Sequence, residues 1–596
     1  MSKNSYPKVP WRTVKDPIAG HPRTYENGIK LDWYTTEAPA GSYRSIFKWG
    51  NPKEYKVPSE GMFNYMMKKL DFTPEFLNSK KNFGDSPVKY EIKSQLSVEE
   101  HKALLAFVAG DGADDDYTRL RVAYGQTMID LMRLREGIVE NVPDLVLYPS
   151  TTEQIENIVK YCDEHKIAIY VYSGGSSVTR GVEPTVKRSI TLDLGKNFNK
   201  IISVNEINET VTVQPGIFGT ALEAYLNNPD NFKSGNAYTV GHFPQSFEYS
   251  TVGGWVVTRG AGQNSCYYGK IEDLVLTQQY VTPVGTFRTE RAPRKATGPD
   301  INQIMMGSEG TFGILTEVTL KLHRRSRVQK PFCYLSRDWD SGVAFMRDVM
   351  QAERGVPSVF RISDGEESDL GLRMYGLGKI EGLLKTFGLE LGKCCLIVGF
   401  CDGDPDYQRM TIRNVKKNAR KHHLTSFLPG IVVPKWSSGR FSDPYMRDNY
   451  QDFGVIIDTL ECAMPWDEVD HIHDYVRKFI KSHPNVICTC HISHCYQNGA
   501  NLYFIWMQKD EGIEKFKEFH SGVLNAIQES GASISHHHGI GKLFAPYNAK
   551  QLGDVQMDML KALKHHFDPN GIMNPGGTLG LDLKEEEKRF LRDDIK

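Results

Sequence analysis

The chain has 596 residues, of which 40% are hydrophobic and 24% are charged, and its formal net charge at pH 7 is −1. A chain of this length can bury a sizeable core and is expected to hold several domains, and its balanced charge argues against a nucleic-acid binder that relies on a basic surface. It contains no run of about 18 apolar residues, so no transmembrane helix is expected, and its first residues lack the apolar core of a secretory signal.

Residues 1–140 are predicted to form a mainly helical N-terminal region, with helical stretches at Val98–Val108 and Tyr117–Leu134. A soft apolar cluster precedes them, beside two lysines. Packing in the core is its expected role, and contact with a membrane surface is the alternative. The cluster consists of Met62, Phe63, Tyr65, Met66, Met67 and Leu70.

The chain then predicts a strand–helix–strand unit. Asp144–Tyr148 and Ile167–Tyr172 are apolar runs typical of buried strands, and Ser150 with Glu153 fits a capping box that starts the helix between them. A glycine–serine loop, Ser173–Ser177, follows the second strand. Such a loop exposes successive backbone N–H groups and lets a diphosphate approach without a clash with Cβ; taken alone, it could equally be a tight turn.

Two more glycine-rich runs follow, at Gly241–Val275 and Met306–Ile314. The glycines of the first run indicate backbone that closely approaches something planar or anionic. Alternating strand patterns occur at Ser189–Leu194, Glu209–Val213 and Leu315–Leu322. From about residue 332, strands and amphipathic helices alternate without a glycine-rich phosphate loop, which indicates a separate mixed α/β domain.

Three separated motifs, SGGSS near residue 175, PQSFEYSTVGGW near 250 and GSEGTFGILTEV near 310, resemble the flavin-binding domain of the vanillyl-alcohol oxidase family. No G-x-G-x-x-G occurs in the right context, which argues against a Rossmann site. The resemblance implies an α+β fold in which a two-part FAD-binding domain lies beneath a mixed α/β cap. The implied domains are an N-terminal helical region at 1–140, the FAD-binding domain at 141–325, the cap at 332–560, and a C-terminal segment at 561–596 that returns to the FAD-binding domain through Phe567–Pro575.

Within this family the chain is most similar to members that make ether lipids, through LREG at Leu134–Gly137, TGPDI at Thr297–Ile301 and HHHG at His536–Gly539. This likeness implies a redox-neutral exchange of the acyl chain of acyl-dihydroxyacetone phosphate for a long-chain fatty alcohol, through a flavin N5 adduct. It also implies a homodimer associated with the lumenal membrane face of a peroxisome or glycosome. The last residues, Arg592–Lys596, are not an SKL-type peroxisomal address, so such an address would lie either elsewhere or beyond the end of this sequence.

The resemblance further implies that four segments contact FAD and that the cofactor is held without a covalent bond. Attachment to His242 or Cys266 is the alternative. The residues assigned to FAD are Tyr172, Ser173, Gly174, Gly175, Ser176, Ser177, Val178, Gln245, Ser246, Phe247, Glu248, Tyr249, Ser250, Thr251, Thr258, Arg259, Gly260, Ala261, Gly307, Ser308, Glu309, Gly310, Thr311, Phe312 and Gly313.

The substrate site is assigned by the same resemblance. Arg447, in DPYMRD, matches an arginine that binds the substrate phosphate, a task that suits a bidentate guanidinium; an ion pair with Asp448 is the structural alternative. Arg361, in SVFRIS, matches an arginine that supports the site near the flavin. Tyr503, in NLYFIW, matches a proton donor or acceptor, and is otherwise a core tyrosine with its hydroxyl bonded at the rim. To act as a base, its phenol pKa would have to fall from about 10 toward neutrality, which requires nearby cations.

Three consecutive histidines, His536, His537 and His538, complete the predicted catalytic set. If this run is a strand, His536 and His538 share one face and His537 lies on the other, so that one metal ion could not readily bind all three. We therefore expect phosphate contacts and proton transfer rather than metal ligation.

A second group of thiols and imidazoles suggests zinc by its density, but its C-x-C spacing differs from the usual two-residue spacing of zinc ligands. We expect no metal here either, and we interpret the ten scattered cysteines as reduced thiols. The group consists of Cys488, Cys490, His491, His494 and Cys495.

Two other functions compete with ether-lipid synthesis. An FAD-dependent 2-hydroxy-acid dehydrogenase would carry motifs like G-D-G-N-L-H and E-H-G-I-G, whose His and Glu help to hold a metal. Here Tyr503 stands in place of that His and His537 in place of that Glu, which argues against hydroxy-acid oxidation. A non-catalytic flavoprotein or lipid-binding scaffold would have no reason to keep Arg447, Tyr503 and the histidines together.

Overall fold

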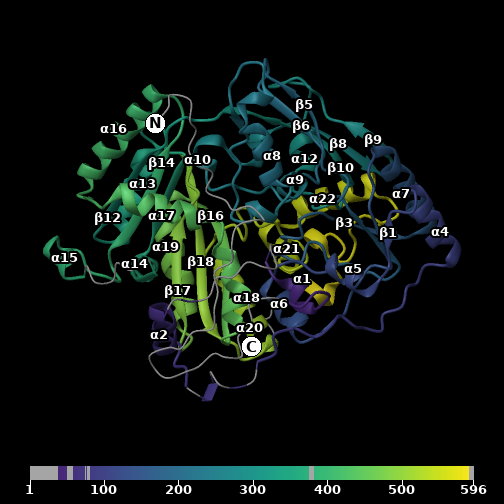
Figure 1. The fold of residues 1–596 in the computed structure, drawn as a ribbon, viewed down its shortest axis with the longest axis horizontal. Helices are drawn as coiled ribbons and strands as arrows, with labels where there is room; N and C mark the ends of the chain where they lie inside the picture. The colour runs from purple at the N-terminus through teal and green to yellow at the C-terminus, as the bar shows by residue number, and fades with distance from the viewer. Residues whose placement is uncertain are drawn as a thin grey trace.

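The computed structural model describes residues 38–49, 58, 60–73, 75–76, 79, 81–374 and 381–588. The chain start and the run Arg592–Lys596, on which the signal and address predictions depend, lie outside the described residues. Three main sheets with their helices form two halves, which we call the FAD-binding half and the cap after the domains that the resemblance implies (Figure 1). In the described part of the chain, no helix is long and apolar enough to cross a membrane.

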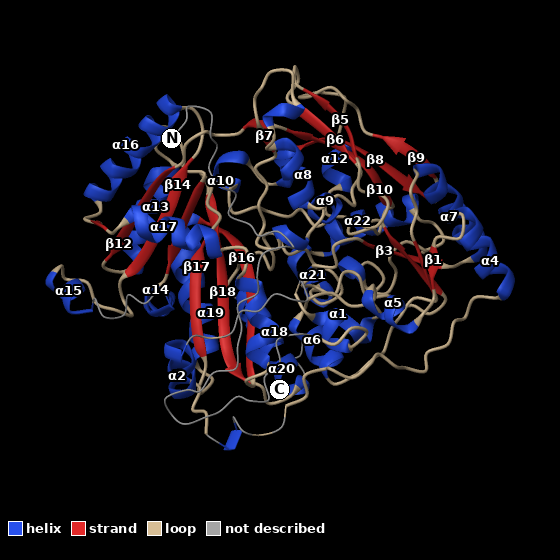
Figure 2. Cartoon of the chain, viewed as in Figure 1, coloured by secondary structure: helices blue, strands red, loops and turns tan. Residues whose placement is uncertain are grey.

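The FAD-binding half contains two of the three main sheets (Figure 2). A four-stranded sheet has the order β1-β2-β4-β3, with β2, β4 and β3 parallel, and shares an apolar core with helix α7. A five-stranded antiparallel sheet has the order β5-β6-β10-β8-β9 and packs with helices α8 and α9. The elements of this half are β1 (Gly112–Ala113), β2 (Leu145–Leu147), α7 (Thr152–His165), β3 (Ala168–Tyr172), β4 (Ser189–Asp193), β5 (Ile201–Asn205), β6 (Thr210–Val213), α8 (Gly219–Leu226), β7 (Tyr238–Thr239), α9 (Val252–Val257), α10 (Ser265–Tyr268), α11 (Ile271–Leu274), β8 (Val275–Thr282), β9 (Gly285–Arg288), α12 (Ile301–Met305), β10 (Ile314–Lys321) and β11 (His323–Arg324).

Helix α7 begins one residue later than the predicted capping box. Its N-cap is Thr151, whose hydroxyl accepts a hydrogen bond from the Gln154 backbone N–H at 3.2 Å. The Gln154 side chain in turn accepts from the Ser150 backbone N–H at 2.7 Å. The prediction of Ser150 with Glu153 is wrong because Thr151 and Gln154 offer the same hydroxyl and carbonyl chemistry one position further on.

The predicted helix over Tyr117–Leu134 is also wrong, because the chain turns in its middle. Gln126 N donates to the Ser177 carbonyl at 2.6 Å, and a Cβ on Gly125 would lie 2.5 Å from that same oxygen. The turn therefore brings the N-terminal region against the glycine–serine loop. The N-terminal helices are α1 (Tyr43–Phe47), α2 (Glu60–Lys69), α4 (Val98–Phe107), α5 (Asp116–Arg121) and α6 (Met128–Arg135).

The cap is built on a seven-stranded antiparallel sheet with the order β15-β12-β14-β13-β17-β18-β16. Helices α13, α16, α19 and α20 share one apolar core with it. Its elements are β12 (Lys330–Ser336), α13 (Trp339–Met350), β13 (Val359–Ser363), α14 (Gly365–Met374), α15 (Glu381–Thr386), β14 (Cys395–Cys401), α16 (Pro405–Lys421), β15 (Thr425–Ser426), α17 (Pro429–Gly439), α18 (Met446–Gln451), β16 (Val455–Pro465), α19 (Val469–Lys481), β17 (Ile487–Ile492), β18 (Gly499–Lys509) and α20 (Ile513–Glu529).

The soft apolar cluster of the sequence lies on α2, which packs against the cap. Met62, Phe63, Met66 and Leu70 are buried in a core that also contains Phe453 and residues of β16 to β18. Core packing, the expected role of these four side chains, is confirmed.

The C-terminal segment joins the FAD-binding half. After α21 (Ala545–Leu552) and α22 (Asp554–Phe567), the chain runs beside β3, where Ile169 N donates to the Ile572 carbonyl at 2.8 Å and Asn574 N donates to the Ile169 carbonyl at 2.9 Å. The loop before α21 carries the three histidines, so this return places them at the junction of the two halves.

Candidate active site

A cavity of about 290 Å³ lies between the FAD-binding half and the cap. All four segments predicted to hold FAD contribute to its wall. Their lining residues are Ser173, Gly174, Gly175, Ser176, Ser177, Val178, Gln245, Ser246, Ser250, Thr251, Thr258, Gly260, Ala261, Glu309, Gly310 and Gly313.

The other residues assigned to FAD lie outside this lining. Phe247 and Phe312 are fully buried in the apolar core beneath the cavity, and Arg259 pairs with Glu272 at 3.8 Å instead. The two phenylalanines therefore anchor their segments in the core and do not face the cavity. The residues that do not line the cavity are Tyr172, Phe247, Glu248, Tyr249, Arg259, Gly307, Ser308, Thr311 and Phe312.

The wall fits a flavin dinucleotide. Among the described residues, none accepts a hydrogen bond from the backbone N–H groups of residues 174–178, so the loop has free donors for a diphosphate. Gly254 and Gly260 have no positive φ, and a Cβ on either would meet no atom closer than 3.4 Å. The fold itself does not require glycine at these two lining positions, and a flat ligand against the wall explains them.

Arg447 lies on α18, at the cap side of the cavity. Its Nη1 donates to the Gln126 carbonyl at 2.6 Å, its Nη2 to Asp458 Oδ1 at 2.8 Å and its Nε to the Ile457 carbonyl at 3.4 Å. A guanidinium carries five N–H donors. In the described part of the chain three of them fix the side chain, and two are left for a ligand.

The ion pair between Arg447 and Asp448 that the sequence offered as an alternative is wrong. Asp448 is buried and accepts a hydrogen bond from Lys48 Nζ at 2.9 Å. The next residue after Lys48, Trp49, lines the cavity. Arg44 likewise pairs with Asp452 at 2.8 Å. These two ion pairs, from α1 and the residue that follows it, hold α18 and therefore Arg447 in position.

Tyr503 lies on β18 and lines the cavity. Thr459 Oγ1 donates to the Tyr503 oxygen at 3.3 Å, and the same oxygen is 3.3 Å from His538 Nε2. Burial raises the pKa of Tyr503 to about 12, and the Arg447 guanidinium opposes this only in part. The fall of the phenol pKa toward neutrality, which an ionised base would require, is therefore not met, and Tyr503 stays protonated at neutral pH.

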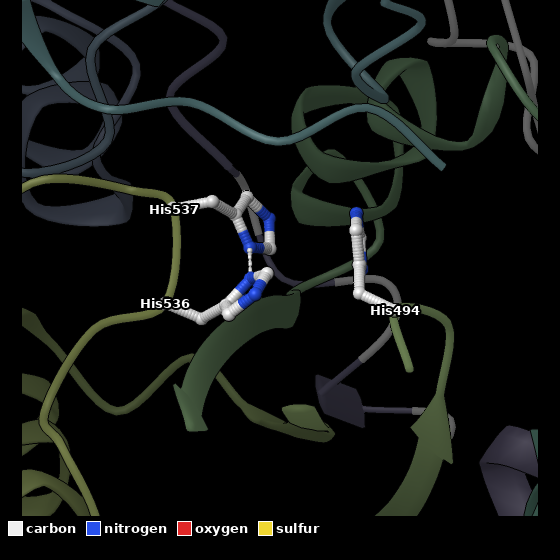
Figure 3. A group of neighbouring side chains, drawn as sticks. All are labelled: His494, His536 and His537. Carbon is white, nitrogen blue, oxygen red and sulfur yellow. Dashed lines mark hydrogen bonds between the residues drawn. The ribbon is translucent and has the colours of Figure 1, made fainter. Parts of the chain in front are cut away.

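The histidine run is an irregular loop and not a strand, so the condition under which His536 and His538 would share one face is not met. His537 and His538 line the cavity, whereas His536 lies behind it with Nε2 3.0 Å from the Tyr496 hydroxyl. Figure 3 shows His536 Nδ1 and His537 Nδ1 facing each other at 3.0 Å, with His494 opposite them. Burial lowers the pKa of His538 to about 3, so its imidazole is neutral and can accept a hydrogen bond.

Because the run is not a strand, the geometric argument against a metal no longer holds. The ligand atoms of His494, His536 and His537 lie within 4.8 Å of one another, and so do those of Glu461, His537 and His538. Among the described residues no such group includes a cysteine, and all ten cysteines are free thiols, as predicted. The absence of a metal stays a prediction.

Glu461 is the residue of this site that the sequence analysis missed. It is 1% exposed, lies on β16 opposite Tyr503, and accepts hydrogen bonds from the backbone N–H groups of the histidine loop. Its signal in the sequence is a lone glutamate in the apolar strand Val455–Pro465, since a glutamate is almost never fully buried without partners.

Arg361 lies one layer outside the cavity. It pairs with Glu367, and its Nη2 is 3.0 Å from His491 Nδ1. The His491 ring stacks on Tyr503 with a centroid separation of 4.9 Å. Arg361 therefore contacts the ring that supports Tyr503 and not the cavity itself.

Comparisons with known proteins agree with this geometry. Residues 143–290 match a family model described as an FAD binding domain, and residues 330–578 match the C-terminal domain of FAD linked oxidases. Alkyldihydroxyacetonephosphate synthase of Caenorhabditis elegans is 31% identical over 496 residues, which cover 78% of this chain and 80% of the relative. The Dictyostelium discoideum enzyme of the same name is 29% identical over 581 residues, covering 93% and 90%. A solved structure of alkyldihydroxyacetonephosphate synthase superposes with a TM-score of 0.75 at 24% identity and covers 89% of this chain and 99% of its own.

These findings confirm the predicted α+β fold with its two-part FAD-binding domain and mixed α/β cap. The relative from Caenorhabditis elegans is 31% identical over about four-fifths of both chains, and this similarity shows the family. The chain is an FAD-dependent enzyme of the alkyldihydroxyacetonephosphate synthase family.

Proposed function

We propose that this protein exchanges the acyl chain of acyl-dihydroxyacetone phosphate for a long-chain fatty alcohol, giving alkyl-dihydroxyacetone phosphate and a fatty acid with no net oxidation. The observation that carries the proposal is that Arg447, Tyr503 and His538 line the same cavity as the glycine–serine loop. That cavity also has an apolar wall suited to a lipid, made by Trp49, Pro444, Met446, Ile457 and Ile505.

The side chains divide the chemistry among them. The two remaining donors of Arg447 bind the substrate phosphate as a fork. The Tyr503 oxygen takes a proton from the substrate carbon while its own proton passes to His538 Nε2, so that the phenol need not be ionised beforehand. When bound, FAD supplies an electron-accepting ring beside that carbon. The reverse transfer returns the proton after the carboxylate has left and the alcohol has entered.

The direct test incubates the FAD-loaded protein with acyl-dihydroxyacetone phosphate and labelled hexadecanol. Labelled alkyl product and fatty acid should form in equal amounts without any added electron acceptor. If no label is transferred, and a 2-hydroxy acid instead reduces an added dye, the protein is a 2-hydroxy-acid dehydrogenase and the proposal fails.

The flavin is expected to be held without a covalent bond, because neither candidate for attachment lines the cavity. His242 is buried against the Trp255 ring, and burial lowers its pKa to about 3. Cys266 faces Cys495 at 3.5 Å. Acid or heat should therefore release a yellow supernatant and leave a colourless pellet. Flavin retained by the denatured chain, located by peptide mass spectrometry, would point back to one of these two residues.

The subcellular location follows from the substrates, because both carry long apolar chains. We propose a homodimer associated with a membrane surface on the lumenal side of a peroxisome or glycosome. Fractionation of cells should place the protein with peroxisomal markers, extractable by high salt or carbonate. Recovery with cytosolic markers would contradict the assignment.

A further inference from the structure

We infer that Glu461 is the positioning residue of a proton relay that runs from Glu461 through His538 to Tyr503. The inference rests on the proposed function, since it assigns a partner to the residue that receives the Tyr503 proton. Glu461 Oε1 lies 3.7 Å from His538 Nδ1, and His538 Nε2 lies 3.3 Å from the Tyr503 hydroxyl. The two ring nitrogens of one imidazole thus face a carboxylate and a phenol.

The strand register builds this arrangement. Tyr503 on β18 is paired with Glu461 on β16. Thr459 is two residues before Glu461, so the two side chains share one face of the strand, and Thr459 donates to the Tyr503 oxygen at 3.3 Å. Because Thr459 donates, the Tyr503 proton is free to point at His538, which is the direction that the relay needs.

Glu461 also holds the histidine loop in position. Its Oε1 accepts from the backbone N–H groups of His536 at 3.0 Å, His537 at 3.0 Å and His538 at 3.1 Å, and from the Ser535 hydroxyl at 3.1 Å. Burial by itself would raise the pKa of Glu461, but the His537 imidazole, 3.4 Å away, helps to keep it well below its usual range. A carboxylate is stable here because so many donors surround it.

The negative charge has two consequences for His538. It favours the neutral ring form with the proton on Nδ1, which leaves Nε2 as the acceptor for Tyr503. It also stabilises the imidazolium that forms when the proton arrives, acting against the burial that lowers the pKa of His538. A carboxylate that orients a catalytic imidazole and balances its charge is a general device of proton-transfer sites.

The test replaces Glu461 by Gln in the full-length, FAD-loaded protein. The glutamine removes the charge and turns N–H groups toward the loop's own N–H donors. We expect kcat of the exchange to fall by about 10²-fold or more, with KM for acyl-dihydroxyacetone phosphate nearly unchanged because Arg447 still holds the phosphate. Glu461→Asp keeps the charge at a longer distance and should recover about a tenth or more of the wild-type kcat.

The matched control is Glu223→Gln, which alters another buried glutamate that accepts from the Val240 N–H at 2.8 Å and the Thr239 hydroxyl at 3.0 Å. It should lose stability but keep its turnover per bound flavin. Equal losses of kcat in Glu461→Gln and Glu223→Gln, or loss of FAD from both Glu461 variants while Glu223→Gln stays loaded, would mean that Glu461 only supports the fold, and would overturn the inference.

A second measurement separates this inference from the proposed function. In ¹⁵N-histidine NMR, with the His538 signals assigned from His538→Gln, wild-type protein should show His538 protonated on Nδ1, and Glu461→Gln should shift it toward the other tautomer. An unchanged tautomer would refute the role of Glu461. A wild-type protein with this tautomer but no exchange activity would refute only the proposed reaction.

Discussion

Replacing Tyr503 by Phe should lower the exchange rate by about 10²-fold or more, the usual contribution of one acid–base group, while FAD content and fold survive. The substitution keeps the ring that stacks on His491 and removes only the hydroxyl that joins Thr459 to His538. The measurement is turnover per bound flavin, with the melting temperature recorded beside it. Near-normal turnover at full flavin loading would mean that the proton leaves by another route, with His537 as the next candidate.

The matched control is Tyr280→Phe. Tyr280 is buried in the FAD-binding half, where its hydroxyl donates to Gln278 and is 3.3 Å from the Met305 carbonyl. This variant loses one buried phenolic hydroxyl, as Tyr503→Phe does, but lies outside the cavity lining. A fall in melting temperature without a fall in turnover per flavin is expected.

The pH profile tests how Tyr503 works. Burial raises its pKa from about 10 to about 12, so the protonated form that the relay requires persists from neutral pH until the pH approaches that value. Titration of Tyr503 should therefore cause no rise in kcat between pH 7 and about 10. A phenol that acts as a pre-ionised base would instead give a kcat that rises with pH across this range, and Tyr503→Phe would abolish the rise.

The cofactor site was predicted well from the sequence because it depends on local backbone. A run such as Ser173–Ser177 carries its own free N–H groups wherever the chain places it, and glycines 254 and 260 mark the wall regardless of their neighbours. What the sequence missed is which members of each segment face the ligand. Phe247 and Phe312 follow the same motifs but turn into the core, since a large apolar side chain is stabilised by burial.

The catalytic side was predicted in its residues but not in its electrostatics. The phenol pKa of Tyr503 depends on burial by residues that are distant in sequence, and Arg447 pairs with Asp458 while Asp448 pairs with Lys48, which lies 400 residues earlier in the chain. Glu461 was missed for the same reason. Its four hydrogen-bond donors come from a loop about 75 residues away in sequence, and no local sequence pattern predicts such a contact.

Arg447→Lys should chiefly weaken substrate binding, and the structure gives the reason. The arginine uses three of its donors on Gln126, Asp458 and a backbone carbonyl, and keeps two for the phosphate. A lysine ammonium has only three donors on one nitrogen. It can remain beside Asp458 or bind the phosphate, but it cannot do both with the geometry of a planar fork.

We therefore expect KM for acyl-dihydroxyacetone phosphate to rise by about 10- to 100-fold, the range of one or two charge-assisted hydrogen bonds, with kcat falling much less than in Tyr503→Phe. Initial rates measured across a range of concentrations of both substrates separate the effect on KM from the effect on kcat. KM for the fatty alcohol should stay within a few-fold of the wild-type value. The control is Arg373→Lys, which alters a half-exposed arginine paired with Asp369 in the cap. If Arg447→Lys lowered kcat at saturating substrate and left KM unchanged, the guanidinium would act in the proton transfer itself. The phosphate would then have to be bound by another cation, and Lys270, whose Nζ is 2.8 Å from the His536 carbonyl, is the first to replace.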